Sequence, residues 1–341
     1  MKATIFDGHT TRAFTAADHD IVSADTPFGW IDVCADGPDD PQVAPFLASL
    51  GFSDILAAYT SRSDGLGLFQ QFDNNLVGAT WAMPDEGNEP VIVHLVWNPA
   101  RLVTVRAGAN KAMASVTQQI DARGLHLFSE PTVVPGVVME LILASVDSRL
   151  TNIDGEVADL DGEIIVAVSP AQLPRLRAIR DQVAPLARRL PTYLDNVAEA
   201  FVDPTSLPGM DSNGAQYLQA YQGKVQSTVS RVSDVESSIR DAAQDYQTEV
   251  GNKQGQRINQ LTIVSILFLP ITFLTGYFGM NFQWLVNETQ SFASWLLLGA
   301  VAPIAVVLAS AGVLVRRGYD LRRSDPSRRA AKPSPPPTPS S

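Results

Sequence analysis

Two long stretches without charged side chains dominate the C-terminal part of the chain. Residues 258–287 contain no Asp, Glu, Lys or Arg, and residues 289–315 form a second such stretch. A helix needs about 20 apolar residues to cross the hydrocarbon core of a membrane. The sequence therefore predicts two transmembrane helices, over residues 258–281 and 292–315, joined by a short external loop at 282–291.

The distribution of charge predicts the orientation of this hairpin. Residues 1–257 carry 18 Lys and Arg against 33 Asp and Glu, whereas residues 258–341 carry 7 against 3. All seven basic residues follow the second helix, in a Pro- and Ser-rich tail at 316–341 whose composition is typical of disorder. Because basic segments stay on the cytoplasmic side, we expect both termini in the cytoplasm, with the chain in a cell membrane of the inner or plasma type.

Composition narrows the function classes. The N-terminal residues include no apolar stretch of the signal-peptide type, and Cys34 is alone, so no intrachain disulfide is expected. The acidic balance of residues 1–257 argues against a nucleic-acid partner. The four histidines show no metal-ligand spacing, and no Ser/His/Asp grouping or Gly-rich phosphate loop is present. The sequence therefore predicts neither an enzyme nor a resident cofactor.

Residues 1–130 are predicted to form a cytosolic α/β domain. Short β-rich segments occur at 2–6, 29–34, 67–72, 77–83, 91–97 and 102–107, and helical patterns occur at 45–51, 53–59 and 109–123. The hairpin-like spacing of the later strands implies a mixed sheet with helices packed on it. On residue type alone, Trp30 is expected in the core and Asp32 as a loop cap.

Residues 131–203 predict an antiparallel pair of cytosolic helices. Apolar residues recur at helical spacing from Val138 to Leu160, interleaved with acidic residues, and an Arg-rich helix follows over 176–193. The opposite charges suggest that the pair is held together partly by charge. Two ordinary amphipathic helices would pack in the same way without any role in function.

A very long helix is predicted after a break at 204–214. From residue 216 to residue 282 only tolerated glycines and Pro270 interrupt the pattern. About 70 residues at 1.5 Å each give ~100 Å, so one helix would run from a cytosolic stalk at 211–257 through the membrane. Apolar residues from Val225 to Val250 share one stripe of the stalk. Because a single copy would expose this stripe, self-association into a bundle is expected.

A second stripe lies on the first predicted membrane helix. Counting 100° per residue from Ile258, this residue and five later positions fall within about 80° of one another, namely Leu261, Ser265, Leu269, Thr272 and Gly276. Such a mixture suits a pore wall, in which hydroxyls offer oxygen and leucines form constrictions that can dewet. Close packing between helices also favours small residues, and the spacing alone does not separate the two interpretations.

The end of this helix carries a specific motif. Gly279-Met280-Asn281 and Phe282 close the helix, preceded by Leu261-Thr262, Phe268-Leu269-Pro270 and Thr272-Phe273, and a Trp-x-Asp element occurs at Trp30. Closing the first of two C-terminal helices, the motif resembles that of the CorA family of divalent-cation channels. The resemblance implies a funnel-shaped homopentamer with an α/β N-terminal cytosolic domain, an α-helical stalk and a two-helix transmembrane hairpin, whose first helix lines the axis and whose second faces lipid.

The resemblance also implies a function and assigns roles. It implies passive uptake of divalent cations driven by the membrane potential, chiefly Mg²⁺, with Co²⁺ and Ni²⁺ as further permeant ions, and it favours the pore interpretation of the stripe. Gly279, Met280 and Asn281 would form the selectivity filter, with the Asn281 amide oxygens contacting a hydrated metal ion, because Mg²⁺ gives up its water reluctantly. The expected partners are further copies of the chain, membrane lipid and divalent cations.

Two further roles follow from the charged residues outside the membrane. Glu288 is the one anion of the external loop, so recruitment of cations would rest on it. Regulatory cation sensing, which the resemblance implies for the cytosolic part, would use the acidic face of the stalk at Asp234, Asp241, Asp245 and Glu249. The stalk begins Tyr217-Leu218-Gln219-Ala220 where many family members have Tyr-x-Arg-Asp, so one sensing carboxylate is missing.

Two alternatives stay open. A Zn²⁺ transporter of the related ZntB kind would share the architecture, although such proteins usually carry a different middle residue in the motif, and Met280 argues for Mg²⁺. A membrane-anchored coiled-coil scaffold would share the long helix and conduct nothing. Replacement of Asn281 by alanine separates the scaffold from the channel. It should abolish uptake by a channel, whereas the association of a scaffold should stay intact.

Overall fold

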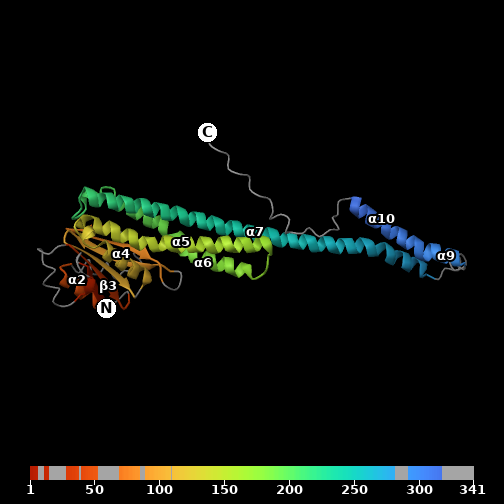
Figure 1. Ribbon diagram of the computed structural model, residues 1–341, viewed down its shortest axis with the longest axis horizontal. Coiled ribbons are helices and arrows are strands. Elements are labelled where there is room, and N and C mark those ends of the chain that lie inside the picture. The colour runs from red at the N-terminus through yellow and green to blue at the C-terminus, as the bar shows by residue number, and fades with distance from the viewer. Residues whose placement is uncertain are drawn as a thin grey trace, which may run out of the picture. The chain divides into compact units, whose positions relative to one another are not determined.

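The structure is a computed structural model (Figure 1). It describes residues 1–6, 11–14, 28–37, 40–52, 69–84, 89–108, 110–280 and 291–316. The chain divides into two compact units. The first contains Met1–Gly162 and Ser169–Gln244, and the second contains Glu163–Val168 and Asp245–Ser341. The first unit therefore holds a sheet and most of a helical layer, and the second holds the candidate membrane segments.

A mixed sheet forms the N-terminal part of the first unit. Its strands are β1 (Lys2–Phe6), β2 (Thr11–Ala13), β3 (Gly29–Ala35), β4 (Gln70–Phe72), β5 (Asn75–Ala82), β6 (Val91–Asn98) and β7 (Arg101–Ala107). They lie in the order β2-β1-β3-β7-β6-β5-β4. Strands β3 and β7 are parallel, and the other neighbours are antiparallel. The predicted mixed sheet is confirmed, although β2 has only three residues and was not expected.

Helices α2 (Val43–Ser49) and α4 (Lys111–Phe128) accompany this sheet. Alternate residues of the strands, including Ile31, Val33 and Val103, form a core with Val43 and Leu47 of α2. Burial of this period-2 set is what holds α2 on the sheet, because each buried aliphatic side chain contributes about 1.5–3 kcal/mol. The helix expected at 53–59 lies outside the described residues.

The polar end of the Trp-x-Asp element is buried in β3, so its interpretation as a loop cap was wrong. Asp32 is 5% exposed. Its carboxylate accepts a hydrogen bond from Thr104 Oγ1 at 2.8 Å and pairs with the Arg106 guanidinium at 3.0 Å. Thr104 Oγ1 in turn accepts from Trp30 Nε1 at 3.1 Å. The element therefore joins the parallel strands β3 and β7 through a buried polar chain, which a carboxylate needs when it leaves water.

Three helices pack together in the first unit. After the 3₁₀ turn η1 (Pro131–Val133) come α5 (Val134–Val166), α6 (Gln172–Ala200), the 3₁₀ turn η2 (Pro204–Ser206) and α7 (Ser212–Phe278). Arg149 of α5 donates to Gln182 Oε1 of α6 at 2.8 Å, and Arg231 of α7 donates to Thr151 Oγ1 of α5 at 2.8 Å. Figure 1 shows the three helices running side by side over this part of the chain.

The long helix α7 begins four residues earlier than predicted, and the expected break extends only to Asp211. Asp211 Oδ1 accepts from the backbone N–H of Gly214 at 2.8 Å and from Thr132 Oγ1 at 2.9 Å. These hydrogen bonds to the ionised form lower the pKa of Asp211. The side chain thus caps the first turn of α7, and the residues before Gln216 join the helix because their free N–H groups have a partner.

Most of the apolar stripe of the stalk is covered by the chain itself. Val225, Val232, Val235, Ile239 and Ala242 are all at most 5% exposed. These residues belong to the first unit, where α5 and α6 are the helices bonded to one another and to α7. The prediction that a single copy exposes this stripe was therefore wrong for these five residues, whereas Val229, Tyr246 and Val250 stay partly exposed.

Two buried tyrosines join the helices to the sheet. Tyr221 of α7 hydrogen-bonds to Tyr193 of α6, and its hydroxyl lies 2.9 Å from Thr80 Oγ1 of β5. The Tyr193 ring centroid lies 5.0 Å from that of Trp81. Burial raises the pKa of Tyr221 to about 12, and burial followed by the neighbouring Tyr221 raises the pKa of Tyr193 well above its usual range.

These tyrosines should make folding sensitive to alkali. An unfolded tyrosine has a pKa of about 10, so above that pH the unfolded chain releases protons that the folded chain retains. Their contribution to stability is present below about pH 10 and is lost as the pH rises through about 12. In thermal unfolding of the detergent-solubilised protein, Tyr221→Phe should reduce this fall, whereas the same change at the exposed Tyr217 should not. An equal slope in wild type and Tyr221→Phe would contradict the assignment.

The second unit contains two apolar helical segments. One is the end of α7, and the other comprises α9 (Phe292–Leu296), the π-helical turn η3 (Leu297–Val301) and α10 (Ala302–Arg316). Both segments, within Ser212–Tyr277 and over Phe292–Val313, are long and apolar enough to cross a membrane, and their most apolar windows are not buried. The arrangement fits the predicted two-span hairpin, with α7 ending at Phe278 and α10 reaching Arg316.

Candidate functional site

The predicted stripe on the membrane segment of α7 is exposed throughout. Ile258, Leu261 and Leu269 are 65%, 69% and 71% exposed. Ser265, Thr272 and Gly276 are exposed as well. One face of a single chain thus presents leucines, hydroxyls and a glycine in sequence along the helix axis, with no cover from the described residues.

The opposite face of the same segment is half-buried. Ile263, Leu267, Ile271 and Leu274 have intermediate exposure. On α10, intermediate exposure recurs at helical spacing, at Ala302, Pro303, Val306, Val307, Ser310 and Ala311. Figure 1 shows α10 running back beside the end of α7. The two half-buried faces are therefore the faces that the two helices turn toward each other. The stripe is therefore the face of α7 that the hairpin leaves uncovered.

The hydroxyl groups of the stripe are fixed by the helix that carries them. Ser265 Oγ donates to the carbonyl oxygen of Leu261 at 2.9 Å, and Thr272 Oγ1 donates to that of Phe268 at 2.9 Å. With its proton used in this way, each hydroxyl presents lone pairs outward. An oxygen in this state can accept a hydrogen bond from the water shell of a cation.

The hydroxyl of Thr275, beside the stripe, was not among the predicted pore-wall groups. Thr275 is exposed, and its Oγ1 donates to the carbonyl oxygens of Ile271 at 3.0 Å and Thr272 at 3.1 Å. At 100° per residue it falls about 40° outside the stripe. A wider angular window around Thr272 would have included it.

The helix ends at the Gly-Met-Asn motif. Gly279 N donates to Thr275 O at 2.9 Å, and Met280 N donates to Tyr277 O at 3.3 Å, so the last turn tightens. A Cβ at Gly279 would lie 3.0 Å from Thr275 O, so a larger residue here would crowd that carbonyl oxygen. Met280 is 44% exposed. The predicted filter residue Asn281 and the predicted recruiting residue Glu288 lie outside the described residues.

The predicted sensing residues lie along one helix but form no cluster within the chain. Asp234, Asp241 and Asp245 are exposed, and Glu249 is half-buried and accepts a hydrogen bond from Asn252 at 3.2 Å. Among the residues that the structure describes, no group of three or more His, Cys, Asp or Glu is arranged to hold a metal ion. Their sensing role stays a prediction, and it would need carboxylates from a second copy.

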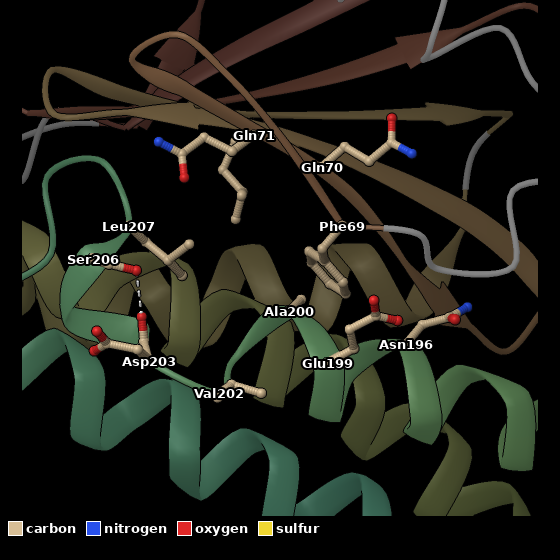
Figure 2. A pocket seen from close by; sticks show the side chains of 11 residues that line it. Phe69, Gln70, Gln71, Asn196, Glu199, Ala200, Val202, Asp203, Ser206 and Leu207 are labelled. Atoms are coloured by element: carbon tan, nitrogen blue, oxygen red, sulfur yellow. Dashed lines mark hydrogen bonds between the residues drawn. The ribbon is translucent and has the colours of Figure 1, made fainter.

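A cavity of about 520 Å³ lies in the first unit, between β4 and the end of α6 (Figure 2). Gln70 and Gln71 line one side, and Asn196, Glu199 and Asp203 line the other. Figure 2 shows the Ser206 hydroxyl directed at Asp203, where it donates to the backbone carbonyl at 2.7 Å. Apolar side chains, including Phe69, Leu76 and Leu207, complete the lining of the cavity. The two carboxylates are not part of any group of three or more possible metal ligands among the described residues.

Most of the chain, residues 27–311, matches one family, described as CorA-like Mg2+ transporter protein. The chain belongs to the CorA family. The match extends from just before β3 into α10, so it includes strands β3 to β7, the long helix and most of both apolar segments. The resemblance that the Gly-Met-Asn motif suggested is thereby confirmed.

Individual relatives resemble this CorA-family chain to different extents. The Cobalt/magnesium transport protein CorA of Thermotoga maritima is 29% identical over 85 residues, which are 25% of this chain and 23% of that protein. The match spans less than a quarter of that curated relative.

Solved structures extend the likeness to the whole fold. The complete structure of the CorA magnesium transporter from Methanocaldococcus jannaschii has a TM-score of 0.72 at 14% identity, covering 93% of this chain and 98% of that one. The full-length CmaX protein has a TM-score of 0.69 at 15% identity, covering 93% and 97%. These likenesses establish the predicted fold class, an α/β domain followed by a long helix and an apolar hairpin.

Proposed function

We propose that this chain forms a passive channel for uptake of divalent cations, chiefly Mg²⁺, across a cell membrane. The observation that carries the proposal is the uncovered stripe on the membrane segment of α7, where Leu261 and Leu269 alternate with the hydroxyls of Ser265 and Thr272. Membership in the CorA family supports it. Leucines from the several copies would form rings around the pore, which act as constrictions that can dewet. The hydroxyls between these rings would contact a hydrated ion.

Five copies assemble in the proposed channel, with α7 around the axis and α10 facing lipid. Assembly removes the stripe from lipid, because the stripes of all copies then face one another across a shared water-filled path. Both termini lie in the cytoplasm. Two charges that cross about 100 mV gain about 4.6 kcal/mol, so inward flow needs no nucleotide.

Gly279, Met280 and Asn281 form the proposed filter at the outer mouth. A ring of neutral amide oxygens can hydrogen-bond the water shell of Mg²⁺ without stripping it, whereas a carboxylate ring would hold the ion too tightly to conduct. Ions of similar size and hydration, Co²⁺ and Ni²⁺, would also permeate. Glu288 would raise the local cation concentration outside. Asp234, Asp241, Asp245 and Glu249 are the proposed sensing residues.

Ion flux through the purified full-length protein in liposomes tests this proposal. With a Mg²⁺-sensitive dye inside and a potential that is negative inside, the dye should report Mg²⁺ influx that slows when the potential is removed, because only the concentration gradient then drives it. Influx of Zn²⁺ that needs a proton gradient, without Mg²⁺ influx, would instead support a zinc transporter. Absence of both fluxes from inserted, oligomeric protein would support the scaffold.

A further inference from the structure

The exposed side chains of α5 change from polar to aliphatic at its last turn. From residue 151 to residue 163, the exposed positions of this helix carry only polar or small side chains, namely Thr151, Asn152, Asp154, Gly155, Glu156, Ala158, Asp159, Gly162 and Glu163. The next two exposed residues are Ile165 and Val166, which are 61% and 79% exposed. Their apolar neighbour Ile164 is fully buried. Two large aliphatic side chains therefore project from the tip where the rest of the outer face is polar.

The same tip contacts α7 close to the start of its membrane segment. Residues Glu163–Val168 belong to the same unit as Asp245–Ser341. Lys253 Nζ donates to the carbonyl oxygen of Val168 at 2.5 Å. Lys253 and Arg257 are the last two charges before the charge-free stretch that begins at Ile258. Five residues of helix separate Lys253 from Ile258, which is about 8 Å along the axis.

This distance matches the polar layer of a membrane. The hydrocarbon core is about 30 Å thick and the whole bilayer about 40–45 Å, which leaves about 5–8 Å of headgroup region on each side. If the hydrocarbon begins near Ile258, the Val168 carbonyl lies at the level of the headgroups. Exposed aliphatic side chains at that level contact lipid and not bulk water. Their exposure to bulk water would cost free energy.

We propose that the tip of α5, through Ile165 and Val166, docks into the interfacial layer of the lipid bilayer. This inference rests on the membrane insertion of α7 in the proposed function. It gives the cytosolic helical layer a second attachment to the membrane beside α7 itself. The contact is apolar, so it does not require anionic lipid, and Glu163 next to the tip would oppose such lipid.

A depth measurement on the full-length protein in phosphatidylcholine nanodiscs tests the docking. With Cys34 replaced by serine, an environment-sensitive fluorophore is attached at Val166→Cys, and nitroxide-bearing lipids are added as quenchers. Asp159→Cys is the matched control, because it is exposed on the same face of α5 about 10 Å earlier. We expect quenching at Val166 at least about twofold greater than at Asp159, since only the tip reaches the lipid.

Two further labels make the outcome decisive. Leu308→Cys on α10 reports membrane insertion, because Leu308 is 67% exposed on the apolar helix. Quenching at Leu308 without quenching at Val166 would overturn the docking and leave the proposed function intact, whereas no quenching at either would overturn both. A blue shift without quenching at Val166 would mean that a second copy covers the tip. Adding Ile165→Asp to the Val166 label should abolish the quenching.

Discussion

Replacing Asn281 with alanine should reduce Mg²⁺ influx into liposomes more than about tenfold. A charge-assisted hydrogen bond contributes about 1.5–3 kcal/mol, and replacing the whole ring of amides removes several such bonds at once. A methyl group cannot orient the water shell of the ion, so the barrier at the outer mouth rises. The assay is the potential-driven influx described above, with the mutant and wild type reconstituted at equal density.

Asn287→Ala is the matched control, because it makes the same change in the external loop outside the motif. It should conduct like wild type. Asn281→Asp adds information of a different kind, since a carboxylate ring should lower the concentration that gives half-maximal influx and also lower the maximal rate. Undiminished influx in Asn281→Ala would remove this residue from the filter while leaving Mg²⁺ conduction itself in place.

Features that depend on local pattern could be predicted from the sequence. The hairpin follows from the absence of charge over residues 258–287 and 289–315, since a bilayer excludes charged side chains from long segments. The strands follow from alternation and turn residues, and the helix that becomes α7 follows from its apolar period. The angular position of the stripe also follows from helix geometry, and its exposure in the structure agrees with that position.

Features that depend on which element meets which could not be predicted. The stripe from Val225 to Val250 does not itself reveal its partner, and its residues up to Ala242 are mostly buried within the chain, where a second copy was expected. Asp32 is a short polar residue of the kind that caps loops, yet parallel pairing of β3 with β7 brings Thr104 and Arg106 to it. Sequence separations of 72 residues between Asp32 and Thr104, and of 80 between Thr151 on α5 and Arg231 on α7, hide such arrangements from a local pattern.

Asp147 shows the same limit among the charged residues. It lies on the acidic helix α5, whose charges were expected to meet the basic helix α6. The structure instead pairs its carboxylate with Lys224 and Arg231 of α7, at 2.5 and 3.4 Å. Thr228 Oγ1 of α7 also donates to Asp147 Oδ1 at 3.1 Å. Three side chains on successive turns of α7 thus converge on one carboxylate that is 8% exposed.

Asp147→Ala should therefore destabilise the helical layer more than loss of any exposed carboxylate on α5. It removes the common acceptor and leaves the buried Thr228 hydroxyl with only its own helix carbonyl. Because the Lys224 and Arg231 side chains are 38% and 40% exposed, water can rehydrate them, and we expect a loss of roughly 2–3 kcal/mol rather than the larger cost of an isolated buried charge. Thermal unfolding in detergent should show a midpoint lower by roughly 4–10 °C.

Two comparisons separate this contact from a general effect of losing charge on α5. Asp154→Ala removes an exposed carboxylate two turns later and should leave the midpoint within about 1 °C, as surface changes usually do. Asp147→Asn keeps an acceptor for Thr228 but loses the ion pairs, so its midpoint should fall between those of wild type and Asp147→Ala. Equal midpoints for Asp147→Ala and Asp154→Ala would mean that the α5–α7 interface is held by its apolar contacts alone, and that Asp147 is buried without stabilising it.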